Sequence, residues 1–528
     1  MCSKVQKGAK DGAMPSVMYD YGADEISMAA VPIATNYAKM CEAWPKAICP
    51  YVSVCRWEHL PFRERFDIIR GIHYLLGDNK MNLFRRKVYD KLKNWKILSN
   101  GRTAVMIDGA RRVGKTCLVQ DFVKREYLSS IIVDFSKADE QIKATIRDRP
   151  GDIDALFNTL SLIYNTRLHP RQSAIVFDEV QQYPLARQMI KHLVADGRYD
   201  YIETGSLISL ERNIKDILIP SEEDHIDMHP MDFEEFRWAM GDEVSVQFAR
   251  ECFGEMKPLG QGLHKKMLER YYEYLLVGGM PQAVEAYLET KDFGAADDAK
   301  RGILRIYRDD IGKFAQGYEA KVRAIFDAIP EQLSRKEKRY KLSSITKAAR
   351  FREYEDSFTW LTDARVVNPC FNATEPSMGL GLSKDHTTQK LYMADTGLLV
   401  THAYNDGRYT DNKLYRDIFF GNAGANNGMI VENAVAQELR ATGRNLFFYS
   451  RVDRQSRKNE MEIDFLIRRD GEICPVEVKS AAYQRHASLD KFLGKFKGRI
   501  GIPHILYTKD IMQKDGITHL PLYMAMFL

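Results

Sequence analysis

The segment Gly109–Thr116 reads GARRVGKT and follows an apolar stretch typical of a buried strand. It fits the pattern G-x-x-x-x-G-K-[ST], whose glycines let successive backbone N–H groups point at phosphate oxygens, with the dipole of the following helix behind them. We expect Lys115 to reach the β- and γ-phosphates and the Thr116 hydroxyl to ligate Mg²⁺. The predicted phosphate-binding residues are Gly109, Ala110, Arg111, Arg112, Val113, Gly114, Lys115 and Thr116.

An acidic pair, Asp178 and Glu179, ends the apolar segment Ala174–Phe177 about sixty residues after the loop. Asp178 is expected to hold Mg²⁺ through water. Glu179 is expected to orient and deprotonate the water that attacks the γ-phosphate. A phosphate loop and an acidic pair that each follow their own strand predict ATP and Mg²⁺ as cofactors and hydrolysis as the chemistry.

Two polar residues, Thr204 and Ser206, end the next predicted strand. Such a side chain could sense the γ-phosphate, and the alternative is that it caps the helix that follows. The sequence offers no firm candidate for an arginine that neutralises charge in the transition state. Arg212 lies at a plausible distance, although a surface arginine explains it as well.

A second set of charged residues lies near the C-terminus, in MEIDFLIRR (461–469) and ICPVEVKS (473–480). The period of two in a strand places Glu477 and Lys479 on one face, and a short turn brings Asp464 beside them. This D…E-x-K arrangement resembles that of the restriction-endonuclease-like nucleases. The resemblance implies that Asp464 and Glu477 ligate Mg²⁺ with the Val478 carbonyl, while Lys479 positions the attacking water.

Glu432, on a predicted helix before these strands, would add another carboxylate to the metal site. The alternative interpretation of the whole set is a cross-strand ion pair on a solvated sheet face. A partner such as DNA would need cations for its phosphates. The candidates on or near the helix after the E-x-K strand are Arg485, Lys491, Lys495 and Lys497.

The elements that must position the phosphate loop alternate between apolar strands and helix-length segments. This alternation predicts an α/β fold, a parallel sheet with helices on both faces. Helices are expected from residue 231 to about 365, with a break at Gly278 and Gly279. The predicted strands span 103–108, 130–136, 173–179, 201–206 and 225–230.

The segment 341–371 is predicted to hold two short helices and a strand. This pattern resembles a winged helix, a fold that often binds DNA. The same module can also serve as a packing unit, which is the equal alternative. Lys347, Arg350 and Arg352 could meet phosphates or form an ordinary solvated basic face.

The chain from about residue 81 onward resembles the prokaryotic AAA+-like ATPases, in which such a core precedes a helical region and a C-terminal domain of unknown function. The resemblance implies ATP binding. Many relatives have a Gly-Arg pair where this chain reads DILIPSEED (216–224), so an arginine finger from that segment is not supported. The matching stretches are MNLFRRKVYDKL, GARRVGKT, IVFDEVQ, TGS, MHPMDFEEF, YLLVGGMPQAV, residues 361–399 and VENAVAQEL.

Length and composition bound the number of domains. A chain of 528 residues is too long for one core, and no apolar run approaches the roughly 18 residues that span a bilayer. Eight scattered cysteines without metal spacing favour reduced thiols and a cytoplasmic location. The predicted divisions are 1–80, either an extension outside the native protein or a small extra domain; 81–230, the ATPase core; 231–340, a helical lid or linker; 341–420, winged-helix-like; and 421–528, nuclease-like.

Two function classes follow from these motifs. The first is an ATP-driven enzyme in which nucleotide state controls a Mg²⁺-dependent nuclease domain that acts on nucleic acid, with DNA as the partner. The second is a regulatory or scaffolding ATPase that switches a protein partner or a homo-oligomer and whose C-terminal domain does not cleave. Glu179 and the complete D…E-x-K set favour the first class.

Overall fold

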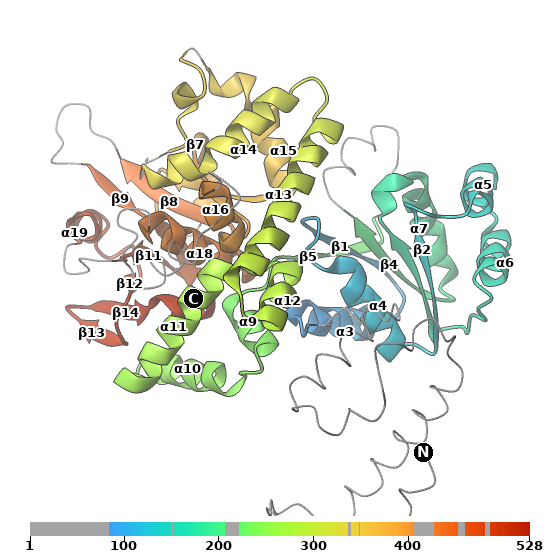
Figure 1. The fold of residues 1–528 in the computed structure, drawn as a ribbon, viewed down its shortest axis with the longest axis horizontal. Helices are drawn as coiled ribbons and strands as arrows, with labels where there is room; N and C mark the ends of the chain where they lie inside the picture. Colours follow the sequence, from blue (N-terminus) through green and yellow to red (C-terminus); the bar gives the residue numbers. More distant parts are fainter. Residues whose placement is uncertain are drawn as a thin grey trace, which may run out of the picture. The chain divides into compact units, whose positions relative to one another are not determined.

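The computed structural model describes residues 84–149, 151–205, 221–335, 339–347, 349–377, 379–404, 427–451, 460–480 and 486–528 (Figure 1). The predicted extension, residues 1–80, lies outside this part of the chain. The same holds for three residues named above, Ser206, Arg212 and Arg485. Residues Asn82–Leu528 form one compact unit.

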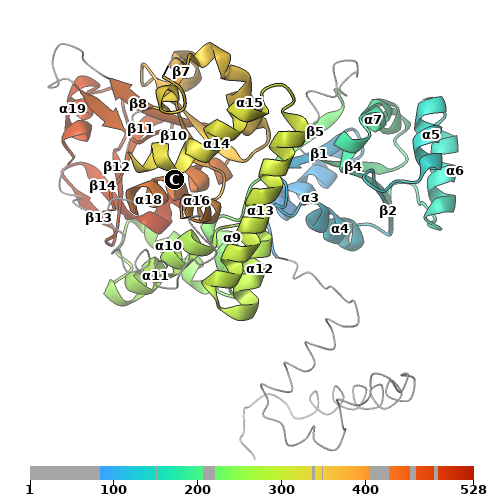
Figure 2. The ribbon, with the colours of Figure 1, turned by 45° about the horizontal axis from the view of Figure 1, so that its top comes forward.

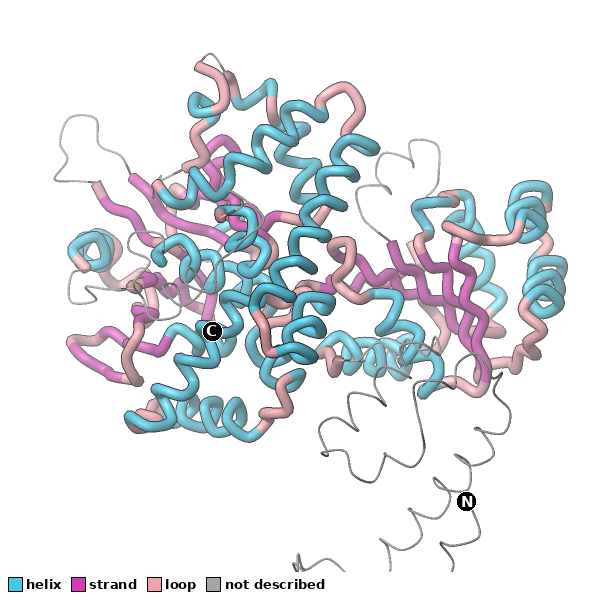
Figure 3. The backbone as a smooth tube through the Cα atoms, in the orientation of Figure 1, coloured by secondary structure: helices cyan, strands magenta, loops and turns pink. Residues whose placement is uncertain are grey.

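Five parallel strands form the first sheet in the order β2-β3-β4-β1-β5 (Figure 3). Because β4 lies between β1 and β3, the end of β4 falls between the phosphate loop and the acidic pair. The predicted parallel sheet is therefore confirmed. The strands are β1 (Ala104–Gly109), β2 (Ser129–Asp134), β3 (Ser173–Asp178), β4 (Asp200–Gly205) and β5 (Glu223–Met228).

Helices cover both faces of this sheet (Figure 2). Val105 and Ile107 pack with α3 (Lys87–Ser99) and α4 (Lys115–Glu126), whereas Met106, between them, packs on the opposite face. Both faces are apolar because each covers a separate hydrophobic layer. The helices of the second layer are α5 (Glu140–Asp148), α6 (Ile153–Ile163) and α7 (Leu185–Asp196).

A run of helices follows the sheet, as the sequence predicts. The expected break lies between α11 and α12, where Gly278 ends one helix and Pro281 begins the next. Pro is well placed there because the first helical residue needs no N–H bond. The helices are α9 (Phe233–Ala239), α10 (Val244–Glu255), α11 (Gln261–Val277), α12 (Pro281–Thr290), α13 (Phe293–Phe314) and α14 (Glu319–Ser334).

The break itself requires glycine because of close backbone packing. A Cβ built on Gly279 would lie 2.1 Å from the Met231 carbonyl oxygen and 2.7 Å from the Met231 nitrogen. The Gly279 N–H donates to an Asp395 carboxylate oxygen at 2.5 Å, and its carbonyl accepts from Met231 N at 2.8 Å. The Gly279 backbone therefore joins Met231, just before α9, to Asp395, just before α16 (Thr396–Ala403).

We expect Gly279→Ala to destabilise the protein by about 2–3 kcal/mol, because the backbone that the new methyl meets has no rotamer by which to move away. Thermal unfolding followed by circular dichroism measures the loss. Gly254→Ala is the matched control, since a Cβ there meets no atom within 4 Å. Equal melting temperatures for the two variants would contradict the packing described here.

The segment predicted to resemble a winged helix contains 3₁₀ turns at Leu342–Ser344 and Phe351–Glu353, then α15 (Glu355–Asp363). The strand predicted after them is β6 (Val367–Ala373), which pairs antiparallel with β7 (Lys384–Met393). β6 also pairs in parallel with β8 (Leu446–Arg451). Strands from both sides of the predicted boundary at 420 thus share one sheet.

The remaining strands build two sheets, with orders β7-β6-β8-β9 and β10-β11-β12-β14-β13. β10 and β11 are antiparallel, and β11 and β12 are parallel. The elements are α18 (Asn427–Ala441), β9 (Met461–Ile463), β10 (Phe465–Arg469), β11 (Glu472–Val478), α19 (Ala487–Lys495), β12 (His504–Tyr507), β13 (Met512–Lys514) and β14 (Ile517–Pro521).

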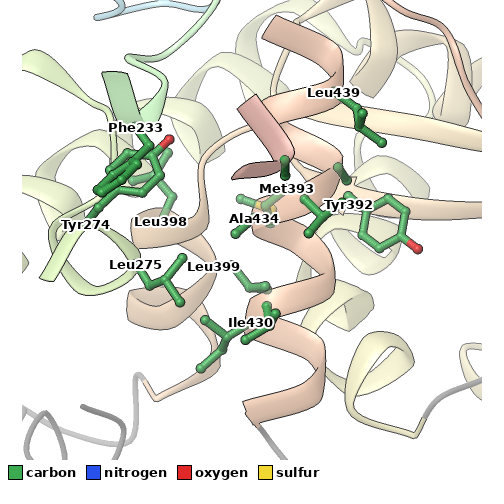
Figure 4. Close-up of a cluster of buried hydrophobic side chains, with 14 of the residues drawn as sticks. Phe233, Tyr274, Leu275, Tyr392, Met393, Leu398, Leu399, Ile430, Ala434 and Leu439 are labelled. Atoms are coloured by element: carbon green, nitrogen blue, oxygen red, sulfur yellow. The ribbon is translucent and has the colours of Figure 1, made fainter. Parts of the chain in front are cut away.

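One hydrophobic cluster joins the helical region to these sheets, and Figure 4 shows its centre, where Leu275, Leu399 and Ile430 converge from α11, α16 and α18. Polar side chains are buried beside it. The Asn433 side chain accepts from Met393 N at 2.8 Å, and the Gln437 side chain accepts from Thr396 N at 2.8 Å. Three stretches that resemble the ATPase family therefore pack together in the interior: VGGMP (277–281), ADTG (394–397) and VENAVAQEL (431–439).

Candidate functional site

The phosphate loop connects the end of β1 to the start of α4. Gly114 precedes the helix with φ +102°, a conformation that L side chains rarely adopt, and Arg112 has φ +69°. These angles turn the chain so that the N-terminus of α4 follows directly on the loop. The local structure matches the strand–loop–helix context that the motif requires.

Lys115 is buried, with only 6% of its surface exposed. Its ammonium donates to the carbonyl oxygens of Gly109 at 2.9 Å and of Ala110 at 3.1 Å. Burial lowers the pKa of Lys115, whereas the carboxylates of Glu179 and Asp108 act in the opposite direction. The ammonium is thus held inside the loop, where an anionic group would offset the cost of its burial.

Thr116 and Asp178 lie side by side, although 62 positions separate them. The Thr116 hydroxyl donates to the two oxygens of Asp178 at 2.9 and 3.1 Å. The Thr204 hydroxyl, from the end of β4, also donates to Asp178. Burial raises the pKa of Asp178, and these two hydrogen bonds lower it. A hydroxyl and a carboxylate beside a phosphate loop are oxygen ligands that fit Mg²⁺.

Glu179 has φ +52°, a positive value that is uncommon outside glycine. Its N–H donates to the Thr204 hydroxyl oxygen at 3.3 Å, and the Gln181 side chain donates to its carboxylate. The sequence did not identify Gln181 as a partner of Glu179, because an amide two residues after an acid is not a recognisable motif. Glu179 is therefore held by two groups at the edge of the sheet.

A pocket of about 590 Å³, part of it open to solvent, adjoins Glu179. The loop residue Arg111 lines it, with Tyr307, Asp310 and Lys313 of α13. Arg111 pairs with Asp310 at 2.5 Å, and the Tyr307 hydroxyl donates to the Arg111 carbonyl at 3.1 Å. Helix α13 therefore contributes one wall of the pocket beside the nucleotide loop.

Arg86 supports the loop from behind, a role that the sequence did not reveal. This buried side chain donates to the Val113 carbonyl at 3.0 Å and to the His229 carbonyl at 2.6 Å, and it pairs with Glu235 at 3.2 Å. Arg86 and Glu235 belong to two of the family-like stretches, MNLFRRKVYDKL and MHPMDFEEF. In the sequence, only the family resemblance of these two stretches pointed to Arg86 and Glu235, because no local pattern connects the two residues.

Arg365, between α15 and β6, also contacts the ATPase sheet. It donates to Asp108, directly before the phosphate loop, at 2.9 and 3.1 Å. It also donates to Asp227 of β5 at 2.9 Å. Asp108 is 1% exposed, so this ion pair is largely shielded from water. The start of the β6–β7 hairpin is thereby tied to the strand that ends in the loop.

The C-terminal charged residues also come together. The Asp464 carboxylate accepts from Val478 N at 2.8 Å, and the Lys479 ammonium lies 2.5 Å from Glu477. Burial, followed by the nearby charge of Glu477, raises the pKa of Asp464 well above its ordinary value. Glu432 of α18 contributes to the same effect. The four predicted residues therefore form one group, in which Glu477 is buried and the other three are partly exposed.

Lys390 of β7, which was not predicted, reaches into this group. Its ammonium lies 3.1 Å from Glu432 and 2.9 Å from Glu462, and the Tyr392 hydroxyl donates to Glu432. The carboxylates suit a divalent ion in chemistry, and Lys390 already offsets part of their charge. Among the described residues, no three His, Cys, Asp or Glu side chains are spaced to hold a metal.

The basic residues proposed for DNA lie on the surface. The ammonium of Lys495 donates to the Tyr449 hydroxyl at 2.6 Å, and that of Lys491 donates to the Glu460 carbonyl at 3.4 Å. These contacts leave both side chains largely in solvent. The exposed residues are Lys347, Arg350, Arg352, Lys491, Lys495 and Lys497.

Three families match parts of the chain. Residues 101–237 match the family described as "AAA domain". Residues 268–408 and 427–524 match two domains of unknown function, DUF8612 and DUF4143. No curated protein matches the sequence.

Solved structures that match parts of this chain include a Walker-type ATPase, PABY2304 of Pyrococcus abyssi. It is 15% identical over 61% of this chain and 97% of its own, with a TM-score of 0.37. Cdc6p of Pyrobaculum aerophilum is 10% identical over 65% and 98%, with a TM-score of 0.26. C. elegans PCH-2 is 11% identical over 43% and 70%, with a TM-score of 0.25.

In the described part of the chain, no helix has the length and apolar character needed to cross a membrane. The predicted ATPase is supported by three observations. The parallel sheet, the strand–loop–helix that carries GARRVGKT and the match over residues 101–237 agree. Residues 101–237 therefore resemble a P-loop ATPase domain of the AAA type, and this resemblance supports the use of ATP.

Proposed function

We propose that the protein hydrolyses Mg²⁺-bound ATP at the end of β1 and β3. Lys115 would leave the loop carbonyls and contact the β- and γ-phosphates. Thr116 and Asp178 would hold Mg²⁺, which neutralises phosphate charge when bound. Glu179 would accept a proton from the attacking water. Thr204 would hold Asp178 and Glu179 in position through its hydrogen bonds to both residues.

One observation carries this proposal: the Thr116 hydroxyl lies 2.9 Å from Asp178, so the loop and the acidic strand meet at one point. The strand order supports it, because the end of β4 places Thr204 between them. Thr204 bonds Asp178 through its hydroxyl and accepts from Glu179 N. It therefore fits the position of a γ-phosphate sensor.

The test is Mg²⁺-ATP turnover by the full chain, measured as phosphate release, for the wild type and Thr204→Val. Valine keeps the volume of threonine and removes both hydrogen bonds. We expect turnover to fall roughly tenfold while ATP affinity stays within about twofold. Thr159→Val on α6 is the matched control, because its hydroxyl bonds only its own helix at Ala155 O. A wild type without turnover would refute the proposed function.

We further propose, as a second function, that the C-terminal domain cleaves nucleic acid with Mg²⁺. The specific support is that Glu432, Asp464, Glu477 and Lys479 lie close together. In addition, the order of the elements in this region, α18-β8-β9/β10-β11-α19-β12, resembles that of the restriction-endonuclease-like core. Asp464 and Glu477 would hold the ion, which polarises the scissile phosphate when bound. Lys479 would position the attacking water. The alternative is a switching ATPase whose C-terminal domain only binds.

The two sites are linked through the β6–β7 hairpin. Arg365 precedes β6 and bonds Asp108 beside the phosphate loop, while β7 carries Lys390 into the carboxylate group. Val367 of β6 pairs with Met393 of β7, so the two ends belong to one hydrogen-bonded ladder. This connection supports a coupling between nucleotide state and the C-terminal domain, in either function class.

A further inference from the structure

The β7-β6-β8-β9 sheet has two chemically different faces. Cys370 of β6 and Leu446 of β8 are paired in register and buried on one face. The next pair, Phe371 and Phe447, points to the other face and is only half-buried. Lys390 is registered with Cys370, so the carboxylate group lies on the face opposite the two phenylalanines. The aromatic pair is therefore separate from the proposed nuclease site.

A pocket with about 1030 Å³ of empty space, part of it open to solvent, lies on this aromatic face. Its floor includes Pro369, Phe371 and Phe447 from neighbouring strands. Its rim carries three cations, Arg365 after α15, Lys384 at the start of β7 and Arg440 of α18. Among the described residues that line it, none is an aspartate or a glutamate.

The two arginines at the rim lie beside carboxylates, and Arg365 pairs with Asp108 at 2.9 Å. Arg365 and Arg440 share one carboxylate, Asp227, with N–O distances of 2.9 and 3.6 Å. Burial lowers the pKa of Arg440, the charge of Asp227 opposes this effect, and the charge of Arg365 makes a smaller contribution that lowers it. Burial and then Arg440 lower the pKa of His229, at the same rim, to about 3. An anion in the pocket would add a second negative partner for Arg440, which shares Asp227 with Arg365.

The ammonium of Lys384 lies 3.6 Å from the ring centroid of Phe371, a cation–π contact at an accessible position. A long lysine side chain can leave this ring by rotation of its own bonds. A flat group that stacks on Phe371 would take the place of the ammonium, which would then reach an anion beside it. Lys384 and Phe371 together can thus bind a flat group that has a negative charge next to it.

We propose that this aromatic pocket, defined by Pro369, Phe371, Lys384, Arg440 and Phe447, binds a segment of single-stranded nucleic acid. A base would stack on the phenylalanine pair, and the adjoining phosphates would pair with Lys384 and Arg440. A duplex fits poorly because its bases are already stacked on one another. An acidic peptide supplies the charge but no flat group for the rings. The proposal goes beyond the proposed ATPase and does not depend on cleavage.

The experiment measures binding of fluorescein-labelled dT15 and rU15 to the full chain by anisotropy, at low salt, with EDTA and without ATP. These conditions separate binding from both proposed catalytic functions. We expect both strands to bind the wild type and a 15-base-pair duplex to bind at least tenfold more weakly. Phe371→Leu with Phe447→Leu should weaken dT15 roughly tenfold, because leucine keeps apolar volume but offers no ring.

Lys384→Gln should weaken the binding of dT15. It should also make the salt dependence less steep, because the slope of log K against the logarithm of the salt concentration should decrease in magnitude by about 0.7. Lys514→Gln, an exposed lysine of β13, is the matched control and should bind as the wild type does. Thermal melting of each variant checks the fold, and a variant that melts early is replaced by the single Phe447→Leu change.

Three results would overturn the proposal. The first is no binding of either strand by the wild type at low salt. The second is unchanged affinity in the folded leucine variants, together with a loss in Lys497→Gln, which would move the contact to the surface near α19. The third is displacement of dT15 by polyglutamate as effectively as by unlabelled dT15, which would show that charge alone drives binding.

Discussion

Lys115→Ala is expected to weaken ATP binding about 100-fold, because the phosphates lose a charge-assisted partner that is buried in the loop. Lys115 is 6% exposed and its ammonium already bonds two loop carbonyls, so no neighbouring cation can replace it without rebuilding the loop. Isothermal titration with a slowly hydrolysed ATP analogue and Mg²⁺ measures the loss. Lys124→Ala, on the exposed side of α4, is the matched control.

Glu179→Gln separates binding from hydrolysis at the same site. The amide keeps the size of the side chain and its contact with Gln181, but it cannot accept a proton from water. We expect ATP affinity to stay near the wild-type value and turnover to fall about 100-fold or more. If Lys115→Ala binds ATP as well as the wild type does, the loop is not the nucleotide site. If Glu179→Gln turns over normally, another group activates the water.

Asp464→Ala is expected to abolish Mg²⁺- or Mn²⁺-dependent cleavage of nucleic acid by the full chain, while ATP turnover continues. The Asp464 carboxylate, between β9 and β10, would be one of the ligands of the ion, so Mn²⁺ binding should weaken as well. Lys479→Ala should also remove cleavage but leave Mn²⁺ binding nearly intact, because the lysine would act on water and not on the ion. Cleavage is measured on labelled DNA and RNA, and Mn²⁺ binding by electron paramagnetic resonance.

Lys390→Met provides the sharpest comparison with these two variants. Removing an ammonium that lies 3.1 Å from Glu432 and 2.9 Å from Glu462 should raise Mn²⁺ affinity roughly tenfold, because the cation would no longer compete with a positive group. Lys384→Met, at the other end of β7, is the matched control. No Mn²⁺ binding by the wild type or by Lys390→Met would identify the group as a structural ion network and favour the switching ATPase.

The sequence by itself determined the local parts of this protein. The spacing of GARRVGKT, the two acids after an apolar strand and the alternation of strands and helices depend on neighbours within a few residues. Periodicity and turn chemistry act over that range. The strand–loop–helix at Gly109–Thr116, the parallel sheet and the break at Gly278 and Gly279 therefore agree with expectation. The family match supports the ATPase that these features predicted.

The D…E-x-K residues were predictable as a group for a related reason. Asp464 and Glu477 lie on consecutive strands joined by a short turn, so strand register alone brings them together. Their roles as metal ligands stay predictions. The sequence also named basic residues at 347–352 and 491–497, and the structure places these side chains at the surface.

Only the tertiary structure decided which distant residues share these sites. Arg365 reaches Asp108 across 257 positions, and Lys390 enters the carboxylate group from a strand 42 residues before Glu432. Nothing in the local sequence distinguishes either cation from a solvated one. Their partners are set by the pairing of β6 with β7 and β8 and by packing in one extended core, which are long-range contacts. The burial that makes such charges matter exists only after those contacts form.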